Sequence, residues 1–224
     1  WIVDRLAADL GERDALDALE AMDAPAAVVE RAVGYVQDTA SQWVAELVGA
    51  GPGERVADLA AAPGGKATAL AGAGAWVAAS DVRPSRVGLV RANAERLGLA
   101  ATVAVLAADG TAPPYRPASF DRVLLDAPCS GLGTLRRRAD ARWRIDEPAV
   151  ERLAGLQRRL LAAGSSLVRP GGTLVYSVCT LTAAEGPGVA ATLDWPALAP
   201  PGAPWRPWGS GALLLPQAAG TDAM

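Results

Sequence analysis

Two cysteines stand where this sequence could carry out nucleophilic chemistry. Cys129 lies in LLDAPCSGLG and Cys179 in LVYSVCTL, and each follows an apolar run of strand length. A thiolate is a strong nucleophile that can form a covalent intermediate with a substrate. Each cysteine could instead be half of a disulfide or a small filler of the core, and these three roles stay open at this point.

The absence of histidine narrows the chemistry. With no histidine in 224 residues, the sequence excludes Ser-His-Asp triads, Cys-His dyads, histidine-ligated zinc and imidazole bases. Lys66 is the single lysine among 21 lysine and arginine residues. Its isolation favours a site that requires a compact ammonium group with movable donors, with chance retention as the alternative.

Three aspartates follow apolar runs in the same way as the cysteines. Asp81 ends WVAASD, Asp126 ends FDRVLLD, and Asp109 comes shortly after ATVAVLA. The turn PGGK, which contains Lys66, follows a further run, RVADLA. A single acid in such a place is often only part of the next turn. Their repeated placement predicts one shared site, provided that these runs end at the same edge of a sheet.

The elements that must position these residues alternate between short apolar runs and helical patterns. The runs predict strands near residues 55–60, 76–81, 101–107, 120–126 and 172–178. Helical patterns separate several of them, most clearly from Pro84 to Gly98. This alternation predicts an α/β fold with a mainly parallel sheet and helices on both faces. Ligands of such sheets bind outside the carboxyl ends of the strands, which is where the chemical residues stand.

The N-terminal part reads as helical. Apolar spacing predicts two short helices separated by Gly11, with the second ended by Pro25. A third helix is expected over about residues 38–48, with Asp38 or Thr39 as its N-cap.

The bulk composition indicates an ordinary globular protein. Apolar residues make up 51% of the chain, charged residues 20%, and the net charge is −3. No run approaches the roughly 18 apolar residues of a membrane span, and no segment resembles a signal peptide. Two cysteines make no disulfide framework. We therefore expect a cytoplasmic monomer without membrane contacts.

The PGGKAT turn is not a good phosphate loop. The motif G-x-x-x-x-G-K-[ST] has alanine here at its first glycine, Ala60, and at its hydroxyl position, Ala67. A glycine turn after the first strand can instead bring backbone close to a nucleoside, and an acid after the second strand suits ribose hydroxyls. Asp81, sixteen residues after Gly65, fits that role. The spacing favours a cofactor with one nucleoside.

Taken together, the motifs resemble those of RNA cytosine carbon-5 methyltransferases, most closely the bacterial RsmB (Sun) type that modifies 16S ribosomal RNA. The resemblance is carried by VADLAAAPGGKATAL, ASDVRPSRV, AADGTAPP, FDRVLLDAPCSGLGTLRRRADARW and GGTLVYSVCTLTAAEG. It runs from about residue 35 to the C-terminus. It implies a Rossmann-like fold that uses S-adenosylmethionine and needs no metal.

The resemblance also implies roles for the thiols. Cys179 would be the nucleophile that adds to carbon 6 of cytosine, and Cys129 would assist breakdown of the covalent adduct. Asp126 would hold the edge of the base, and Lys66 would line the same pocket. The cofactor-binding residues implied by the resemblance are Ala60, Ala61, Ala62, Pro63, Gly64, Gly65, Lys66, Asp81 (at the ribose), Asp109 (near the adenine) and Asp126.

Contact with RNA must be local, because the net charge is mildly negative. The segment LRRRADARWR directly follows Cys129, and arginines and an aromatic ring suit phosphates and an unstacked base. The alternative is a solvated face that pairs with acids elsewhere in the chain. The residues predicted to bind RNA are Arg136, Arg137, Arg138, Arg142 and Trp143.

Two segments follow from the resemblance. Residues 1–34 correspond to a shortened RNA-binding region, and residues 35–224 to a catalytic domain without the family's last strand. Two other functions stay open: a methyltransferase acting on an exocyclic amine, which needs no thiol, and a non-catalytic module for RNA binding or ribosome assembly.

Overall fold

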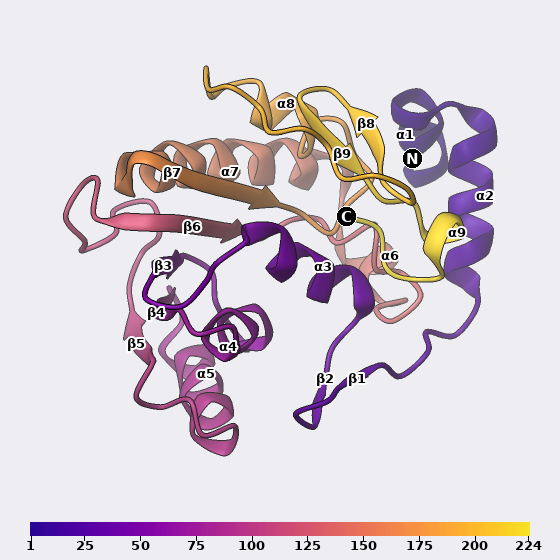
Figure 1. Cartoon of the computed structure of the whole chain (residues 1–224). Helices are drawn as coiled ribbons and strands as arrows, with labels where there is room; N and C mark the ends of the chain where they lie inside the picture. Colours follow the sequence, from indigo (N-terminus) through magenta and orange to yellow (C-terminus); the bar gives the residue numbers. More distant parts are fainter.

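The fold is built on a parallel sheet of five strands, as the sequence predicts. The computed structural model describes all 224 residues, and the strand order is β5-β4-β3-β6-β7. Every neighbouring pair in this sheet is parallel. The strands are β3 (Arg55–Asp58), β4 (Trp76–Asp81), β5 (Val103–Ala107), β6 (Phe120–Asp126) and β7 (Val168–Ser177) (Figure 1).

The strand order places a switch point between β3 and β6. From β3 the chain moves outward through β4 to β5, and it then returns to add β6 and β7 on the other side of β3. Connections leaving β3 and β6 therefore diverge, and a crevice opens outside their carboxyl ends. Asp58 ends β3 and Asp126 ends β6, so both acids border this crevice.

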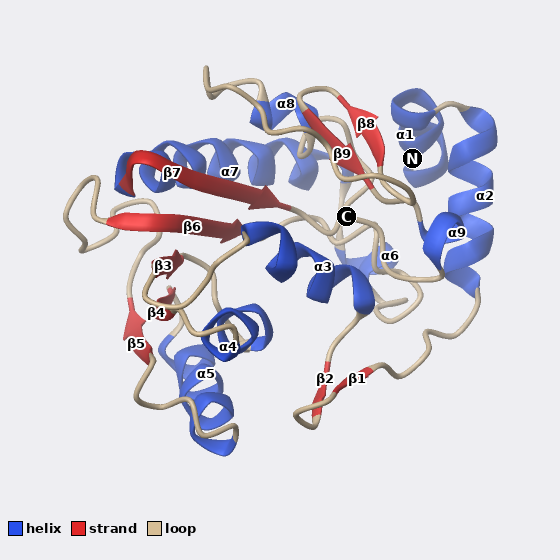
Figure 2. Ribbon diagram, viewed as in Figure 1, coloured by secondary structure: helices blue, strands red, loops and turns tan.

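Helices cover both faces of the sheet. One face carries α3 (Thr39–Val48), α4 (Gly65–Gly72) and α5 (Pro84–Arg96), and the other carries the long α7 (Glu147–Leu167) (Figure 2). Neighbouring residues of a strand point to opposite faces. Leu124 accordingly packs in the cluster under α3, α4 and α5, whereas Leu125 packs in the cluster under α7. The predicted helices are therefore present where the sequence places them.

The first two helices pack against the end of the chain. Gly11, with a φ of 88°, separates α1 (Ile2–Leu10) from α2 (Glu12–Asp23). Leu6 and Met22 from these helices share one buried cluster with Leu213 near the C-terminus. Figure 1 shows α2 beside α9 (Pro216–Ala219). The division of the chain at residue 34 stays a prediction.

A short hairpin leads from α2 into the sheet domain. It consists of β1 (Glu30–Arg31) and β2 (Tyr35–Val36), which pair antiparallel. Helix α3 follows at once, and the Asp38 carboxylate caps it by accepting a hydrogen bond from the backbone N–H of Ala40. This capping was one of the two predicted alternatives.

Three further elements complete the fold. They are α6 (Ala141–Arg144), α8 (Pro187–Ala190) and the separate hairpin of β8 (Arg206–Trp208) and β9 (Gly211–Leu213). Within the main sheet, β7 pairs only with β6. None of the helices has the length and apolar character needed to cross a membrane.

Candidate active site

The two cysteines meet at the carboxyl ends of β6 and β7. These strands are neighbours, and Asp126 at the end of β6 is in register with Ser177 at the end of β7. The loops that follow bring the Cys129 and Cys179 sulfurs to 3.3 Å. That separation is a contact between two free thiols, since a disulfide would hold them at about 2.05 Å. The structure thus brings the predicted pair together across 50 positions of sequence.

The environment of the two thiols is asymmetric. A hydrogen bond from Cys129 lowers the pKa of Cys179, and the Lys66 charge lowers it further, against burial and the charge of Asp126. That same hydrogen bond, together with burial, raises the pKa of Cys129. Cys179 is therefore the more acidic of the two thiols. A nucleophilic cysteine requires a pKa shifted in this direction.

Lys66 lies beside this pair in a buried ion pair. Its ammonium donates hydrogen bonds to Asp126 at 2.7 Å and to the Ser41 hydroxyl at 3.2 Å, and the residue is only 8% exposed. Burial opposes the charged form, but the charge and hydrogen bond of Asp126, together with the charges of Cys179 and Asp58, outweigh it and raise the pKa of Lys66. The ammonium thus remains charged next to Cys179. Ser41 on α3 also belongs to the site, although the sequence motifs do not single it out.

A fourth acid, Asp58, belongs to the same cluster and was missed at the sequence level. It is fully buried, and that burial, with the charge of Asp126, raises its pKa to about 7. Its carboxylate accepts a long hydrogen bond of 3.4 Å from the backbone of Ala60. The sequence feature that could have identified it is its position in the strand-like run RVADLA. In the structure Asp58 ends its strand, as Asp81 and Asp126 do.

The backbone of the turn after β3 packs closely against the elements around it. The N–H of Ala61 donates to the carbonyl of Ser80, which ties the turn to β4. Gly64 has a φ of 106°, and a Cβ there would lie 3.1 Å from Val90 on α5. At Gly65 a Cβ would lie 3.0 Å from the amide of Gln37. The two glycines are therefore needed to place the turn and the first residues of α4.

The hairpin β1–β2 holds this turn from outside. Arg31 donates to the carbonyl of Gly65 at 3.2 Å and to the Thr68 hydroxyl at 2.9 Å. Arg96 on α5 donates to the carbonyl of Gly34 at 3.1 Å, and both guanidinium groups contact the Tyr35 ring. These contacts hold the glycine turn in place next to α5.

The two remaining predicted acids differ in their surroundings. Asp81 is buried at the end of β4, where it accepts a hydrogen bond from the Arg83 N–H and lies 4.0 Å from the Arg86 guanidinium. Asp109 is exposed and accepts two hydrogen bonds from Thr111, which lower its pKa. The residue after Asp109, Gly110, approaches the Leu59 backbone. Asp109 thus lies in the loop after β5, and its place near the adenine stays a prediction.

The arginine segment has partners within the chain. Arg137 pairs with buried Asp222, and Arg136 donates to the carbonyl of Thr221 at 3.1 Å. Arg142 lies 3.7 Å from Asp23, while Trp143 is 85% exposed and Arg138 is exposed. The alternative of pairing with acids thus has structural support for two of these arginines, Arg137 and Arg142, while Arg136 bonds to a backbone carbonyl. RNA contact by the five predicted residues stays a prediction, and Arg138 and Trp143 are the two that remain freely accessible.

The C-terminal residues form a wall of the site, which the sequence analysis also missed. Asp222 is fully buried, and its N–H donates to Asp38 at 3.3 Å. The N–H of Ala223 donates to the carbonyl of Gly133, and the N–H of Gly133 donates to the carbonyl of Cys179. The segment TDAM carries no catalytic motif, so only the tertiary contacts reveal its place.

Known proteins are similar to this chain in sequence and in fold. The family model of the 16S rRNA methyltransferase RsmB/F matches residues 46–193. A probable ribosomal RNA small subunit methyltransferase B from Synechocystis is 44% identical over 155 residues, which cover 67% of this chain and 34% of that protein. A mouse tRNA (cytosine(72)-C(5))-methyltransferase, NSUN6, is 40% identical over 166 residues, with 67% and 34% covered.

A solved structure supports the fold. The methyltransferase homolog protein from Pyrococcus horikoshii superposes with a TM-score of 0.78 at 26% identity, covering 98% of this chain and 91% of that one. The predicted Rossmann-like fold of S-adenosylmethionine-dependent methyltransferases is therefore confirmed. The chain spans about a third of the length of the two curated relatives described above.

Proposed function

Because this chain belongs to the RsmB/F family of 16S rRNA methyltransferases, we propose that it methylates carbon 5 of a cytosine in RNA. The observation that carries this proposal is the pair of thiols in contact at 3.3 Å, with the Lys66–Asp126 ion pair beside them. Carbon 5 of cytosine is a poor nucleophile, so the reaction requires covalent activation of the ring. A thiolate next to a buried cation is suited to supply it.

In the proposed reaction, Cys179 begins catalysis. Its thiolate adds to carbon 6 of cytosine, and the electrons of the 5,6 double bond move toward the ring nitrogen and carbonyl. Asp126 holds the edge of the base and supports protonation at the ring nitrogen. The ring is then an enamine whose carbon 5 can take up a methyl group. Lys66 keeps Asp126 in place through their 2.7 Å contact.

Cys129 is proposed to act in the second half. After methyl transfer, Cys129 releases its own proton to solvent and its thiolate takes the proton from carbon 5. The electrons of that C–H bond restore the 5,6 double bond, the bond from Cys179 to carbon 6 breaks, and Cys179 leaves as a thiolate. Once Cys179 is a thioether, Cys129 no longer donates to a thiolate. It lies against the adduct, where it assists this breakdown.

The residues of the crevice fit S-adenosylmethionine, which when bound supplies an electrophilic methyl group. The turn from Ala60 to Lys66 offers backbone at close range, and the first turn of α4 has N–H groups without helical partners. Asp81 is a buried acid at the strand end where ribose hydroxyls are bound in such folds. Asp126 borders the same crevice, and Asp109 lies in the loop after β5.

We further propose that the substrate is ribosomal RNA, with 16S rRNA as the first candidate. The family description names 16S rRNA, whereas the name of the mouse relative specifies a tRNA. The base must be unpaired or flipped to reach the half-buried thiols. Bisulfite sequencing of RNA from cells with and without the gene tests this choice. A lost methylcytosine in tRNA instead of 16S rRNA would contradict it.

The chemical roles are tested by two matched cysteine variants. With RNA and S-adenosylmethionine, Cys129→Ala is expected to accumulate a covalent protein–RNA adduct, since attack proceeds but release is slowed. Cys179→Ala is expected to form none. Denaturing gel electrophoresis of the protein with labelled RNA measures both.

Equal, adduct-free behaviour of the two variants would contradict the assigned roles. Methyl transfer by the double variant would favour chemistry on an exocyclic amine, which needs no thiol. RNA binding without any shift of the melting temperature by S-adenosylmethionine would favour a non-catalytic module.

A further inference from the structure

One buried carboxylate joins the loops that carry both thiols. Glu185, between β7 and α8, is fully buried. Its carboxylate accepts hydrogen bonds from the Ser130 N–H at 2.8 Å, the Ser130 hydroxyl at 2.5 Å, the Thr182 hydroxyl at 2.9 Å, the Gln157 amide at 3.0 Å and the Thr180 hydroxyl at 3.2 Å. Each of these five groups can donate a hydrogen bond, so one carboxylate gathers polar groups from both loops.

These donors flank the two cysteines. Ser130 directly follows Cys129, and Thr180 directly follows Cys179. The two hydroxyls also contact one another at 2.8 Å. Gln157 on α7 extends the network to the other side of Cys129, because its amide also donates to the carbonyl of Pro128 at 2.9 Å. The backbone on both sides of Cys129 and on one side of Cys179 is thus held by a single network.

We propose that Glu185 is a positioning residue that holds the two thiols in contact and favours Cys179 as the attacking thiol. This inference rests on the proposed function, because it concerns which thiol attacks the base. Glu185 does not touch the reacting atoms, and it acts through Ser130 and Thr180.

The charges around the pair support the second half of this role. Glu185 is anchored directly to the residue after Cys129, while the Lys66 ammonium lies on the side of Cys179 and Asp126. A buried negative charge disfavours a thiolate beside it, and a cation favours one. After the hydrogen bond to Cys179 and burial, the Glu185 charge further raises the pKa of Cys129. The charges of Glu185 and Lys66 therefore act in the same direction, whereas the charge of Asp126 opposes them at Cys179.

The decisive experiment compares which thiol reacts with iodoacetamide. The folded protein is labelled briefly without RNA, and mass spectrometry quantifies alkylation at Cys179 and Cys129. Wild type is expected to react mainly at Cys179. In Glu185→Gln, which keeps the shape and removes the charge, we expect the ratio of Cys179 to Cys129 labelling to fall at least about fivefold. The rate of methyl transfer should fall at least about tenfold, with the affinity for S-adenosylmethionine within about twofold of wild type.

The matched control is Glu147→Gln. Glu147 is an exposed glutamate at the start of α7 that makes no side-chain hydrogen bond, so the labelling ratio should stay at the wild-type value. A glutamate with a purely structural role would lower the melting temperature without moving the ratio. An unchanged ratio and an unchanged rate of methyl transfer in folded Glu185→Gln would overturn the proposal.

A second variant covers the case in which Glu185→Gln does not fold. Thr180→Val keeps the branched shape and removes the hydroxyl that links the two loops, so the labelling ratio should fall in the same direction. A wild-type ratio in this variant would then overturn the proposal. The labelling needs no RNA, so it remains informative even if Cys129→Ala forms no adduct and the proposed function fails.

Discussion

At the scale of single residues, the site concentrates buried charge. Asp58, Lys66 and Asp126 lie within one crevice, with the ammonium of Lys66 as its buried cation. Burying several ionisable groups costs free energy unless each is paired. Lys66 and Asp126 satisfy one another directly, whereas Asp58 has only the long hydrogen bond from Ala60. The burial of Asp58 is therefore the least compensated of the three, and its pKa rises to about 7.

A pH dependence of stability follows from Asp58. Its folded pKa of about 7 lies above the ordinary value of 3.8, so between these values the folded state holds a proton that the unfolded state has released. Stability is therefore lost as the pH rises through this window. Asp58→Asn removes the loss, and we expect it to raise the free energy of unfolding above pH 7 by a few kcal/mol, from about 1.4 kcal/mol per pKa unit.

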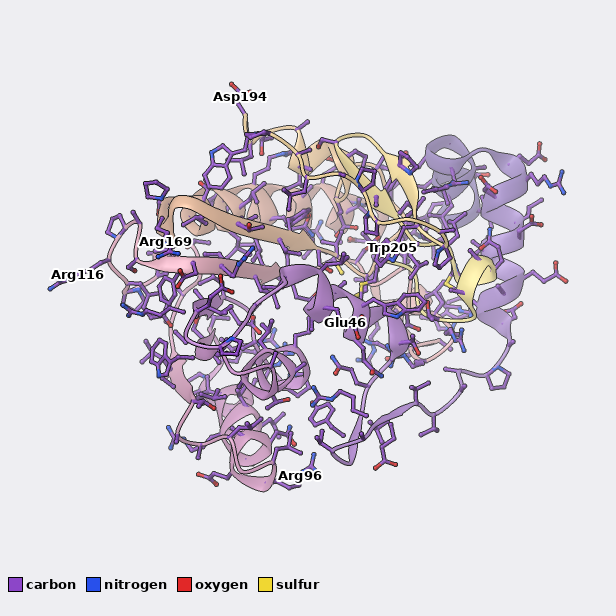
Figure 3. The ribbon with its side chains drawn as sticks, viewed as in Figure 1. Glu46, Arg96, Arg116, Arg169, Asp194 and Trp205 are labelled. Carbon is purple, nitrogen blue, oxygen red and sulfur yellow. The ribbon has the colours of Figure 1, made fainter.

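Thermal unfolding of the Asp58 variant at pH 5 and pH 8 measures this effect. The gain should be larger at pH 8. Asp194→Asn is the matched control, because Asp194 is exposed and projects away from the molecule (Figure 3). An equal gain for Asp58→Asn at both pH values would show that ionisation of this carboxyl is not the cause.

At the scale of elements, the position of α4 decides where Lys66 points. The helix begins at Gly65, directly after the left-handed Gly64, and Lys66 is its second residue. Asn93 and Arg86 on α5 hold the turn by donating to the carbonyls of Pro63 and Ala62. A change in the backbone conformation of this turn would therefore move the Lys66 ammonium, which lies beside Asp126 and Cys179.

Gly64→Ala is expected to destabilise the protein by about 1–3 kcal/mol, because φ of 106° strains any residue with a Cβ and that Cβ would meet Val90. It should also weaken binding of S-adenosylmethionine. Gly72→Ala is the control within the same helix, since a Cβ there meets nothing within 4 Å. Chemical denaturation measures both, and equal stability of the two variants would contradict this account of the turn.

At the scale of the whole molecule, the N-terminal helices and the C-terminal segment are packed into the base of the site. Leu6 and Leu213 share one cluster with Leu132, which follows Cys129, and Leu181, which follows Cys179. The two thiol loops therefore rest on residues from both ends of the chain. The integrity of this cluster should affect both stability and the geometry of the thiols.

Leu6→Ala is expected to lower the free energy of unfolding by about 2–5 kcal/mol, because it opens a cavity in this cluster. Leu16→Ala is the control, as Leu16 is half exposed on α2. Thermal unfolding compares the variants. Equal melting temperatures would show that the N-terminal helices do not support the rest of the molecule.

The sequence by itself determined the strands of the central sheet, the main helices and the place of most site residues along them, but it did not predict the two hairpins or the short helices α6, α8 and α9. Periodicity and turn residues are local, so they placed Asp81 and Asp126 at strand ends. They placed Asp109, Cys129 and Cys179 in the loops beyond. They also placed Lys66 in the glycine turn. Because the carboxyl ends of parallel strands lie at one edge of the sheet, this placement was enough to predict a shared site.

Only the tertiary structure decided which of these residues touch and what lies beneath them. The order of strands is not encoded in any local pattern, and it makes β6 and β7 neighbours so that thiols 50 positions apart meet. The same packing buries Asp58 and Glu185 and brings Asp222 against the arginine segment. Burial and partners set the charge state of an acid, and neither is a property of the residue's place in the sequence.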